Sequence, residues 1–281
     1  MDTVASVRGY VELTRPGNAA AAGALAAIGA FVAGGAADNP FATVAAALAT
    51  VFAVAAGNAI NDYFARDIDP INDPDRPIPR GAVPPRAALA FSLALFAGAV
   101  GLVLPLPVPA IAIAAVNLVA LVAYTELFKG LPGVGNAVVA YLGGSTFLFG
   151  AAAVGALGPA PGVLFALAAL STFTREIIKD VEDIAGDREE GLNTLPIAVG
   201  SRRALALAAA LLVLAVVLSP VPYLRNTFGL PYLAVVVPAD VVMLYAAADA
   251  FERPGHAQRR LKIGMFLAAA AFVVGRLGVV V

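Results

Sequence analysis

Apolar runs of about 20 residues each constrain this chain more than any other feature, because that length of helix crosses the hydrocarbon core of a bilayer. Nine such runs are separated by short polar segments. They cover residues 17–36, 40–60, 87–105, 108–127, 133–155, 161–178, 204–222, 229–249 and 262–281. The pattern predicts an all-α polytopic membrane protein with nine transmembrane helices.

The composition excludes a soluble domain of this size. Hydrophobic residues make up 60% of the 281 residues and charged residues only 13%, so a water-facing surface cannot be built. Many of the runs are rich in Ala and Gly, whose small side chains allow close helix packing in lipid. The chain has no Cys, which excludes disulfides and thiolate metal sites.

The basic residues predict the orientation in the cell membrane. With nine spans, sixteen of the eighteen Lys and Arg residues fall on one side, and only Arg225 and Arg276 fall on the other. Cytoplasmic segments of membrane proteins carry the excess of Lys and Arg. We therefore expect a multi-pass protein with its N-terminus in the cytoplasm and its C-terminus outside.

Twelve of the nineteen acidic residues lie in two segments that follow the second and the sixth span, and both are expected at the cytoplasmic face. The first contains Asp62, Asp67, Asp69, Asp73 and Asp75, and the second contains Glu176, Asp180, Glu182, Asp183, Asp187, Glu189 and Glu190. Their separation by four spans suggests a four-helix repeat, 17–127 and 133–249, followed by a ninth helix at 262–281, within one domain of residues 1–281.

Helical spacing brings some of these oxygens onto common faces. Asn58 and Asp62 are four residues apart, and Asp69 follows Asp62 by seven. Asp180, Asp183 and Asp187 form a second stripe, whereas Asp73 and Asp75 are expected to lie outside the site. Carboxylates at this density repel one another unless cations bridge them, and hard oxygen ligands suit Mg²⁺. The alternative is a pair of solvated acidic loops.

Basic side chains interleave with the acids and could hold phosphate oxygens. They are Arg66, Arg76, Lys129, Arg175 and Lys179. Mg²⁺ ligands together with Arg and Lys are typical of a diphosphate site. Because this site would lie beside an apolar bundle, a polyprenyl diphosphate is the expected ligand.

The motifs resemble those of the UbiA superfamily of intramembrane prenyltransferases. "NDYFARDID" (61–69) matches the first Asp motif of the family and "DIAGD" (183–187) the second, with "LTRPGN" (13–18) and "RPIPRG" (76–81) in the expected order. The resemblance implies helices around a central cavity and Mg²⁺-assisted ionisation of a prenyl diphosphate. It is strongest with an archaeal branch that alkylates geranylgeranylglyceryl phosphate with geranylgeranyl diphosphate in ether-lipid synthesis.

The resemblance also implies roles for particular residues. Asp62, Asp183 and Lys129 are expected to be catalytic. The expected metal ligands are Asn58, Asp62, Asp69, Asp180, Asp183 and Asp187. The expected diphosphate ligands are Arg66, Arg76, Lys129 and Lys179, and the expected acceptor contacts are Arg15, Asn18, Tyr124 and Asn136. Two positions depart from the family pattern: Ala65 replaces the middle Asp of the first motif, and Arg80 replaces a small hydroxyl residue.

Two other functions remain open at this stage. An aromatic prenyltransferase acting on 4-hydroxybenzoate or a related quinone precursor needs the same diphosphate site. A cation transporter also places carboxylates near helix ends, although the spans here are nearly bare of charge apart from Asp240 and Asp249. The expected partners are the prenyl diphosphate, a lipid or aromatic acceptor and the bilayer, with no nucleic acid and no obligate protein partner.

Overall fold

The computed structural model describes residues 3–67, 69, 73–128 and 130–280, and every element in these ranges is helical. The bounds of the elements, in chain order, are α1 (Thr3–Leu13), α2 (Pro16–Ala33), α3 (Pro40–Phe64), a 3₁₀ turn η1 (Ala65–Asp67), α5 (Pro85–Val103), α6 (Val108–Ala123), a π-helical turn η2 (Tyr124–Phe128), α7 (Val134–Ala153), α8 (Pro159–Glu182), α9 (Ile184–Glu189), α10 (Leu195–Val199), α11 (Ser201–Leu218), α12 (Val221–Leu224), α13 (Leu230–Asp249) and α14 (Pro254–Val280).

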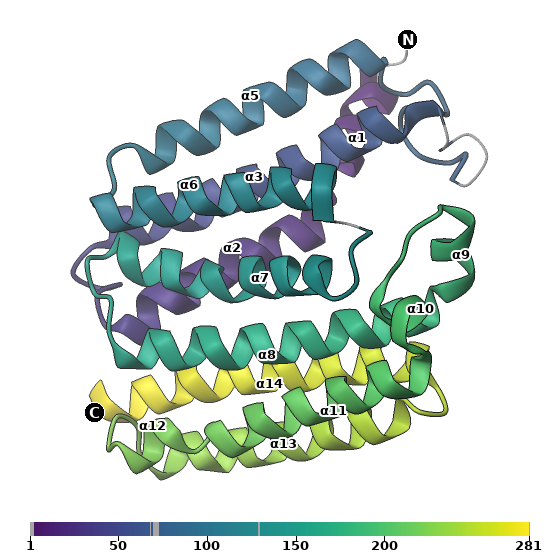
Figure 1. The fold of residues 1–281 in the computed structure, drawn as a ribbon. Coiled ribbons are helices and arrows are strands. Elements are labelled where there is room, and N and C mark those ends of the chain that lie inside the picture. The colour runs from purple at the N-terminus through teal and green to yellow at the C-terminus, as the bar shows by residue number, and fades with distance from the viewer. Residues whose placement is uncertain (1–2, 68, 70–72, 129, 281) are drawn as a thin grey trace.

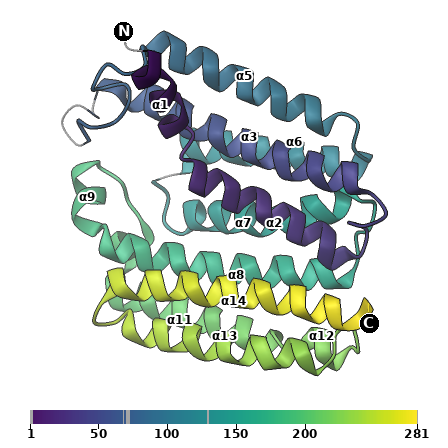
Figure 2. The same ribbon diagram turned by 180° about the vertical axis from the view of Figure 1, so that it is seen from behind.

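The long helices lie side by side in one bundle (Figures 1 and 2). Successive helices pack as neighbours in the pairs α2–α3, α3–α5, α7–α8 and α13–α14, and α2 also packs along α7. Proline starts many of these helices, at Pro16, Pro40, Pro85, Pro159 and Pro254. The first helical position suits proline because its missing N–H would have no partner inside the helix.

The polytopic helical architecture predicted from the sequence is confirmed. Eight of the described helices are long and apolar enough to cross a membrane. The remaining expected span, 108–127, contains α6, an apolar helix of 16 residues that η2 continues. The count of nine crossings and the internal four-helix repeat stay predictions.

Glycine allows the closest helix contact in the bundle, between α2 and α7. A Cβ atom added at Gly150 would lie 1.8 Å from the carbonyl oxygen of Ala26, and one added at Gly29 would lie 2.1 Å from that of Phe147. The two backbones therefore touch directly. Small residues at a helix crossing let dispersion forces act over a long seam in lipid, where no hydrophobic effect draws helices together.

Ionic contacts fasten the bundle at the end that carries α9 and α10. Asp249 at the end of α13 is buried, and its two oxygens accept from Arg253 at 2.9 Å and from Arg260 at 2.6 Å. Gln258 of α14 donates to Glu182, the last residue of α8, at 3.2 Å. The ends of α8 and α13 and the start of α14 are thus held together beside the second acidic segment.

The glycine seam generates a stability prediction. We expect Gly150→Ala to lower the free energy of unfolding by about 1–3 kcal/mol, because the added methyl group overpacks the α2–α7 contact. Gly101 on α5 is the matched control, since a Cβ atom there meets nothing within 4 Å. Gly101→Ala should be neutral or stabilise by up to about 1 kcal/mol through helix propensity. Denaturant unfolding of both variants in detergent measures the difference, and equal stabilities would contradict the assigned seam.

Candidate active site

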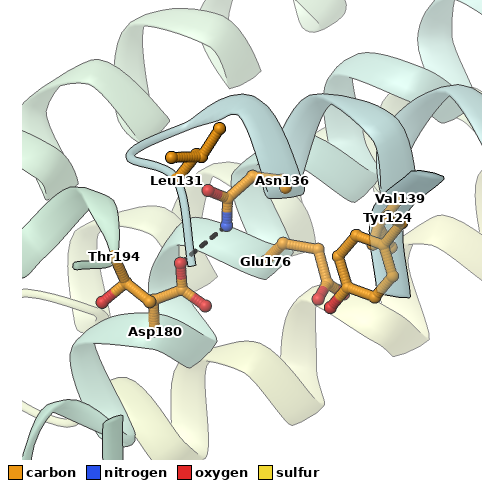
Figure 3. Close-up of a pocket in the computed structure, with 8 residues that line it drawn as sticks. Tyr124, Leu131, Asn136, Val139, Glu176, Asp180 and Thr194 are labelled. Carbon is orange, nitrogen blue, oxygen red and sulfur yellow. Dashed lines mark hydrogen bonds between the residues drawn. The ribbon is translucent and has the colours of Figure 1, made fainter. Parts of the chain in front are cut away.

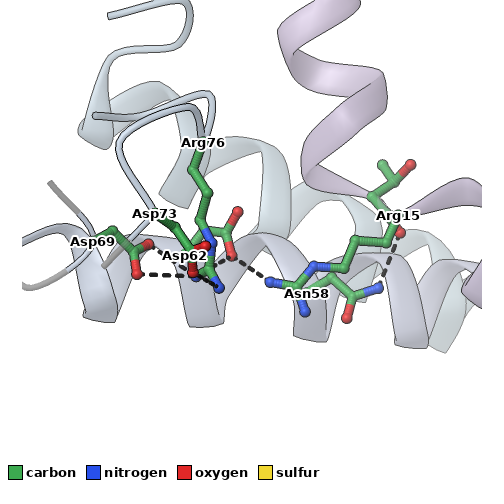
Figure 4. Close-up of polar contacts among 7 residues, drawn as sticks. Arg15, Asn58, Asp62, Asp69, Asp73 and Arg76 are labelled. Carbon is green, nitrogen blue, oxygen red and sulfur yellow. Dashed lines mark hydrogen bonds and ion pairs between the residues drawn. The ribbon is translucent and has the colours of Figure 1, made fainter. Parts of the chain in front are cut away.

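The first acidic segment is built around Asp62, a buried carboxylate on the last turn of α3 that is only 2% exposed. The Arg15 Nη2 atom donates to Asp62 Oδ1 at 2.7 Å, and Arg76 Nη1 lies 3.4 Å from the same oxygen (Figure 4). An isolated buried carboxylate is strongly disfavoured. The two guanidinium groups therefore offset part of the cost of burying the Asp62 carboxylate.

Arg76 also holds the acidic residues that follow α3. Its Nη1 atom lies 3.0 Å from both oxygens of Asp69, and its Nη2 atom lies 2.8 Å from Asp73. Burial disfavours the charged guanidinium, but the carboxylates of Asp69 and Asp62 outweigh it and raise the pKa of Arg76 above its ordinary value. Asp73, which the sequence analysis placed outside the site, belongs to this ion-pair network.

The helical continuation expected from Asp62 to Asp69 is wrong in detail. Helix α3 ends at Phe64, and residues 65–67 form a 3₁₀ turn. Asp69 is linked to Asp62 because Arg76 contacts both carboxylates. A shared arginine, instead of one helical face, brings these two carboxylates together.

Asn58 ties this network to the N-terminal segment. Its Nδ2 atom donates to the backbone carbonyl of Thr14 at 3.0 Å, one residue before Arg15. Arg15 precedes α2 with a φ of 47°, in the left-handed region that non-glycine residues rarely adopt. Asn58 therefore helps to hold Arg15 in the conformation that reaches Asp62.

Asp67 does not replace the carboxylate that the first motif lacks at Ala65. Its side chain is 81% exposed and lies 3.6 Å from Arg66. The Arg66 guanidinium stacks 4.6 Å from the centre of the Tyr63 ring and donates to the Tyr63 carbonyl. Asp67 therefore does not supply the middle carboxylate that the motif lacks at Ala65.

Arg80 joins the loop after the first motif to α1. It donates to the carboxylate of Glu12 and to the backbone carbonyl of Asp75. Hydrogen bonds from Arg80 and Arg8 lower the pKa of Glu12 below its ordinary value. The positive charge expected from Arg80 at the site is thus matched by Glu12.

The second acidic segment does not form the single stripe predicted from its spacing. Helix α8 ends at Glu182, Asp183 follows it as a cap, and α9 starts at Ile184 with a new direction (Figure 1). The Asp183 carboxylate lies 2.7 Å from Lys179 Nζ. Asp187 accepts a hydrogen bond from Thr194 at 3.1 Å, so the break after α8 sends these carboxylates to different partners.

Asp180 lies deeper along α8 and borders a small cavity (Figure 3). It accepts a hydrogen bond from Asn136 Nδ2 at 2.7 Å. The cavity has a volume of about 30 Å³ and is lined by Tyr124, Leu131, Gly135, Asn136, Val139, Glu176, Asp180 and Thr194. The structure thus brings together Tyr124, Asn136 and Asp180, which the sequence analysis had proposed separately. The structure adds Glu176 to this group. Its position four residues before Asp180, about one helical turn, was the sequence signal that could have identified it.

Asn18, also proposed from the sequence as an acceptor contact, does not line this cavity. Asn18 is exposed on the first turn of α2, where its backbone N–H bonds to the carbonyl of Arg15. Lys129 lies outside the described residues. Its neighbour Gly130 accepts a hydrogen bond from the backbone N–H of Asn193 at 3.2 Å, which joins the loop before α7 to the segment after α9.

The donor set suits a cation that shares its shell with a ligand. Within the ranges that the structure describes, no three His, Cys, Asp or Glu side chains converge closely enough to hold a metal ion by themselves. Each acidic segment instead offers carboxylates that arginine or lysine now neutralises. Hard oxygens in small numbers fit Mg²⁺, which keeps several waters and takes phosphate oxygens from its substrate.

Comparison with known proteins places the chain in a family. Residues 22–270 match the UbiA prenyltransferase family. Digeranylgeranylglyceryl phosphate synthase of Halobacterium salinarum is 64% identical over 270 residues, covering 96% of this chain and 98% of the relative. The enzyme of the same name from Natronomonas pharaonis is 65% identical over 274 residues, covering 98% and 99%.

Solved structures agree over the same length. A structure described as giving insights into digeranylgeranylglyceryl phosphate synthase in membranes superposes with a TM-score of 0.83 at 35% identity, covering 97% of this chain and 99% of that one. A UbiA homologue from Archaeoglobus fulgidus bound to GPP and Mg²⁺ shares the fold, with a TM-score of 0.71 at 19% identity and coverage of 95% and 99%. This chain, from its acidic motifs to its helical bundle, belongs to the UbiA prenyltransferase family.

Proposed function

We propose that this protein transfers a geranylgeranyl group from geranylgeranyl diphosphate to the free hydroxyl of geranylgeranylglyceryl phosphate, as a digeranylgeranylglyceryl phosphate synthase in archaeal ether-lipid synthesis. The observation that carries the proposal is the 64–65% identity, over nearly the whole chain, to relatives with that name. The two acidic segments, at the same end of the bundle, support it (Figure 1).

The proposed substrate site has a metal-binding and a phosphate-binding part. Mg²⁺ would be held by Asn58, Asp62 and Asp69 on one side and by Asp180, Asp183 and Asp187 on the other. The diphosphate would be held by Arg66, Arg76, Lys129 and Lys179. Bound Mg²⁺ supplies positive charge that stabilises the departing diphosphate. The A. fulgidus structures with GPP or DMAPP and Mg²⁺ make this a reasonable ligand set for the shared fold.

The residues around the metal ligands have distinct tasks in this proposal. Arg76 already contacts Asp62, Asp69 and Asp73. One of its NH₂ groups could bind a phosphate oxygen while the other keeps a carboxylate partner. Arg15, near the same carboxylates, could meet the phosphate of the acceptor, together with Asn18. Tyr124 and Asn136 would contact the acceptor from the opposite side. The apolar helices around the prenyl chain exclude water, which would otherwise consume an allylic cation.

The proposal includes an orientation in the cell membrane. The end of the bundle with α1, α9 and α10 would face the cytoplasm, and the C-terminus would lie outside. The distribution of Lys and Arg supports this choice. A cytoplasmic site would be reached by a water-soluble diphosphate group while the prenyl chain stays among apolar helices.

A parallel acceptor assay tests the proposed function. Purified protein with Mg²⁺ and labelled geranylgeranyl diphosphate should form an ether product with geranylgeranylglyceryl phosphate and none with 4-hydroxybenzoate. Chelation of the metal should abolish the product. Product with the aromatic acid alone would instead establish the aromatic prenyltransferase. Mg²⁺ flux in proteoliposomes without consumption of the diphosphate would establish a transporter.

Removing one motif carboxylate should stop turnover while the protein still folds. We expect Asp62→Asn or Asp183→Asn to lower kcat/KM by at least about 100-fold. Each change weakens the binding of the cation that stabilises the negative charge growing on the departing diphosphate. Asp75→Asn is the matched control, since Asp75 is exposed in the same loop. Size-exclusion profiles in detergent check folding. Near-normal activity of both motif variants would contradict their assignment.

Restoring the missing carboxylate gives a prediction in the opposite direction. Ala65 lies three residues beyond Asp62 at the end of α3, close enough for an aspartate to join the same ligand set. We expect Ala65→Asp to lower the Mg²⁺ concentration that gives half-maximal activity several-fold, since an added hard oxygen ligand raises affinity. Asp67→Asn, at an exposed position, should leave it unchanged. An unaltered Mg²⁺ requirement in Ala65→Asp would show that this position does not face the metal.

A further inference from the structure

The cavity beside Asp180 is small but large enough for a polar group. Its volume of about 30 Å³ exceeds the roughly 10–15 Å³ that a single water molecule needs on the same measure. It lies between η2, the start of α7 and the last turns of α8 (Figure 3). A hydroxyl group fits this space.

The walls of the cavity select a hydrogen-bond donor. Glu176 and Asp180 both present carboxylates, which only accept when ionised. The Asn136 amide donates to Asp180 at 2.7 Å, so this donor already has a partner. A group that donates a proton, as an alcohol does, can bond to either carboxylate, and the Tyr124 hydroxyl of the lining can also donate to its oxygen. A second carboxylate, such as that of an aromatic acid, would be repelled.

Glu176 lies on the side of the proposed metal ligands toward which the prenyl chain of the substrate would extend. It precedes Asp180 by four residues on α8, which corresponds to about 6 Å along the helix axis at 1.5 Å per residue, and Asp183 follows the end of that helix. Its side chain is 14% exposed. A diphosphate bound at Asp183 and Asp187 would therefore extend its first prenyl carbon toward the level of Glu176.

We propose that Glu176 is the general base that removes the proton of the acceptor hydroxyl, an inference that rests on the proposed function. A lone pair of the hydroxyl oxygen forms the new C–O bond to the first carbon of the prenyl group. The bond from that carbon to the diphosphate oxygen breaks, and its electron pair leaves with the diphosphate. The proton on the acceptor oxygen passes to the Glu176 carboxylate, which balances the reaction.

The surroundings favour Glu176 over its neighbour for this task. Asp180 is already bonded to Asn136 and belongs to the proposed metal ligands. Arg175 donates to Oε1 of Glu176, and Glu176 is also among the residues that line the cavity. Among the described residues, the charged or titratable groups that interact with it include Tyr124 on η2 and Lys179 and Asp180 on α8. The remaining walls, Leu131, Gly135, Val139 and Thr194, are uncharged.

The decisive measurement separates ionisation of the diphosphate from capture of the cation. In Glu176→Gln, we expect ether formation to fall by about 100-fold or more, the usual loss when a general base is removed. Mg²⁺-dependent binding of a non-reactive geranylgeranyl diphosphate analogue should persist, and slow release of geranylgeraniol by water should continue. The ratio of ether to geranylgeraniol would then drop sharply. Glu176→Asp should recover part of the ether product.

Control variants make the assignment falsifiable. Glu252→Gln, an exposed acid in the loop before α14, should behave as the unaltered protein. Equal loss of diphosphate binding and ether formation in Glu176→Gln would overturn the proposal, since it would indicate a metal-binding or structural role. Unchanged ether formation would also overturn it.

The same assay distinguishes failure of the proposed function from failure of this inference. If the unaltered protein alkylates only an aromatic acceptor, the synthase function fails. The ratio of transferred product to geranylgeraniol in Glu176→Gln then tests the base with that acceptor. A preserved ratio would overturn the role of Glu176 with either acceptor.

Discussion

The structure of the site depends on keeping a charged carboxylate inside an apolar bundle. Asp62 is buried at the end of α3, and it remains tolerable there because Arg15 and Arg76 approach it from two other parts of the chain. This requirement shapes what surrounds it. Asn58 holds the carbonyl before Arg15, Arg76 draws in Asp69 and Asp73, and Arg80 fixes the same loop to Glu12 on α1. One buried charge thus organises the N-terminal segment and the loop after α3.

In the second acidic segment, the carboxylates are stabilised by neutral partners as well as by a charged one. Asp180 is bonded by an amide and Asp187 by a hydroxyl, while Asp183 meets Lys179. A cation that binds between the two acidic segments would have to replace single hydrogen bonds or ion pairs in the second segment. In the first segment it would have to replace ion pairs with arginine. Binding of a Mg²⁺–diphosphate complex is therefore expected to exchange ion pairs within the protein for ion pairs with the ligand, at little net change in buried charge.

Much of the site could be predicted from the sequence because helical spacing is local information. Asn58 and Asp62 do lie near one another, and Tyr124, Asn136 and Asp180 do border one cavity. The prediction was wrong where it extended a helix beyond its end. A spacing rule assumes continued helix, but α3 gives way to a 3₁₀ turn at Ala65 and α8 ends before Asp183. Contacts such as Arg15 with Asp62, 47 residues apart, have no local signature.

The sequence by itself determined that the chain is a helical membrane protein with two acidic motifs, since apolar run length and residue type act through local hydrogen bonding and transfer to lipid. The tertiary structure alone decided which charges compensate one another, that Asp67 leaves the gap at Ala65 open, and that Glu176 lines a small cavity beside Asp180. Those outcomes depend on how helices distant in sequence pack and where they break. That packing is set by close contacts such as the one between Gly150 and Ala26.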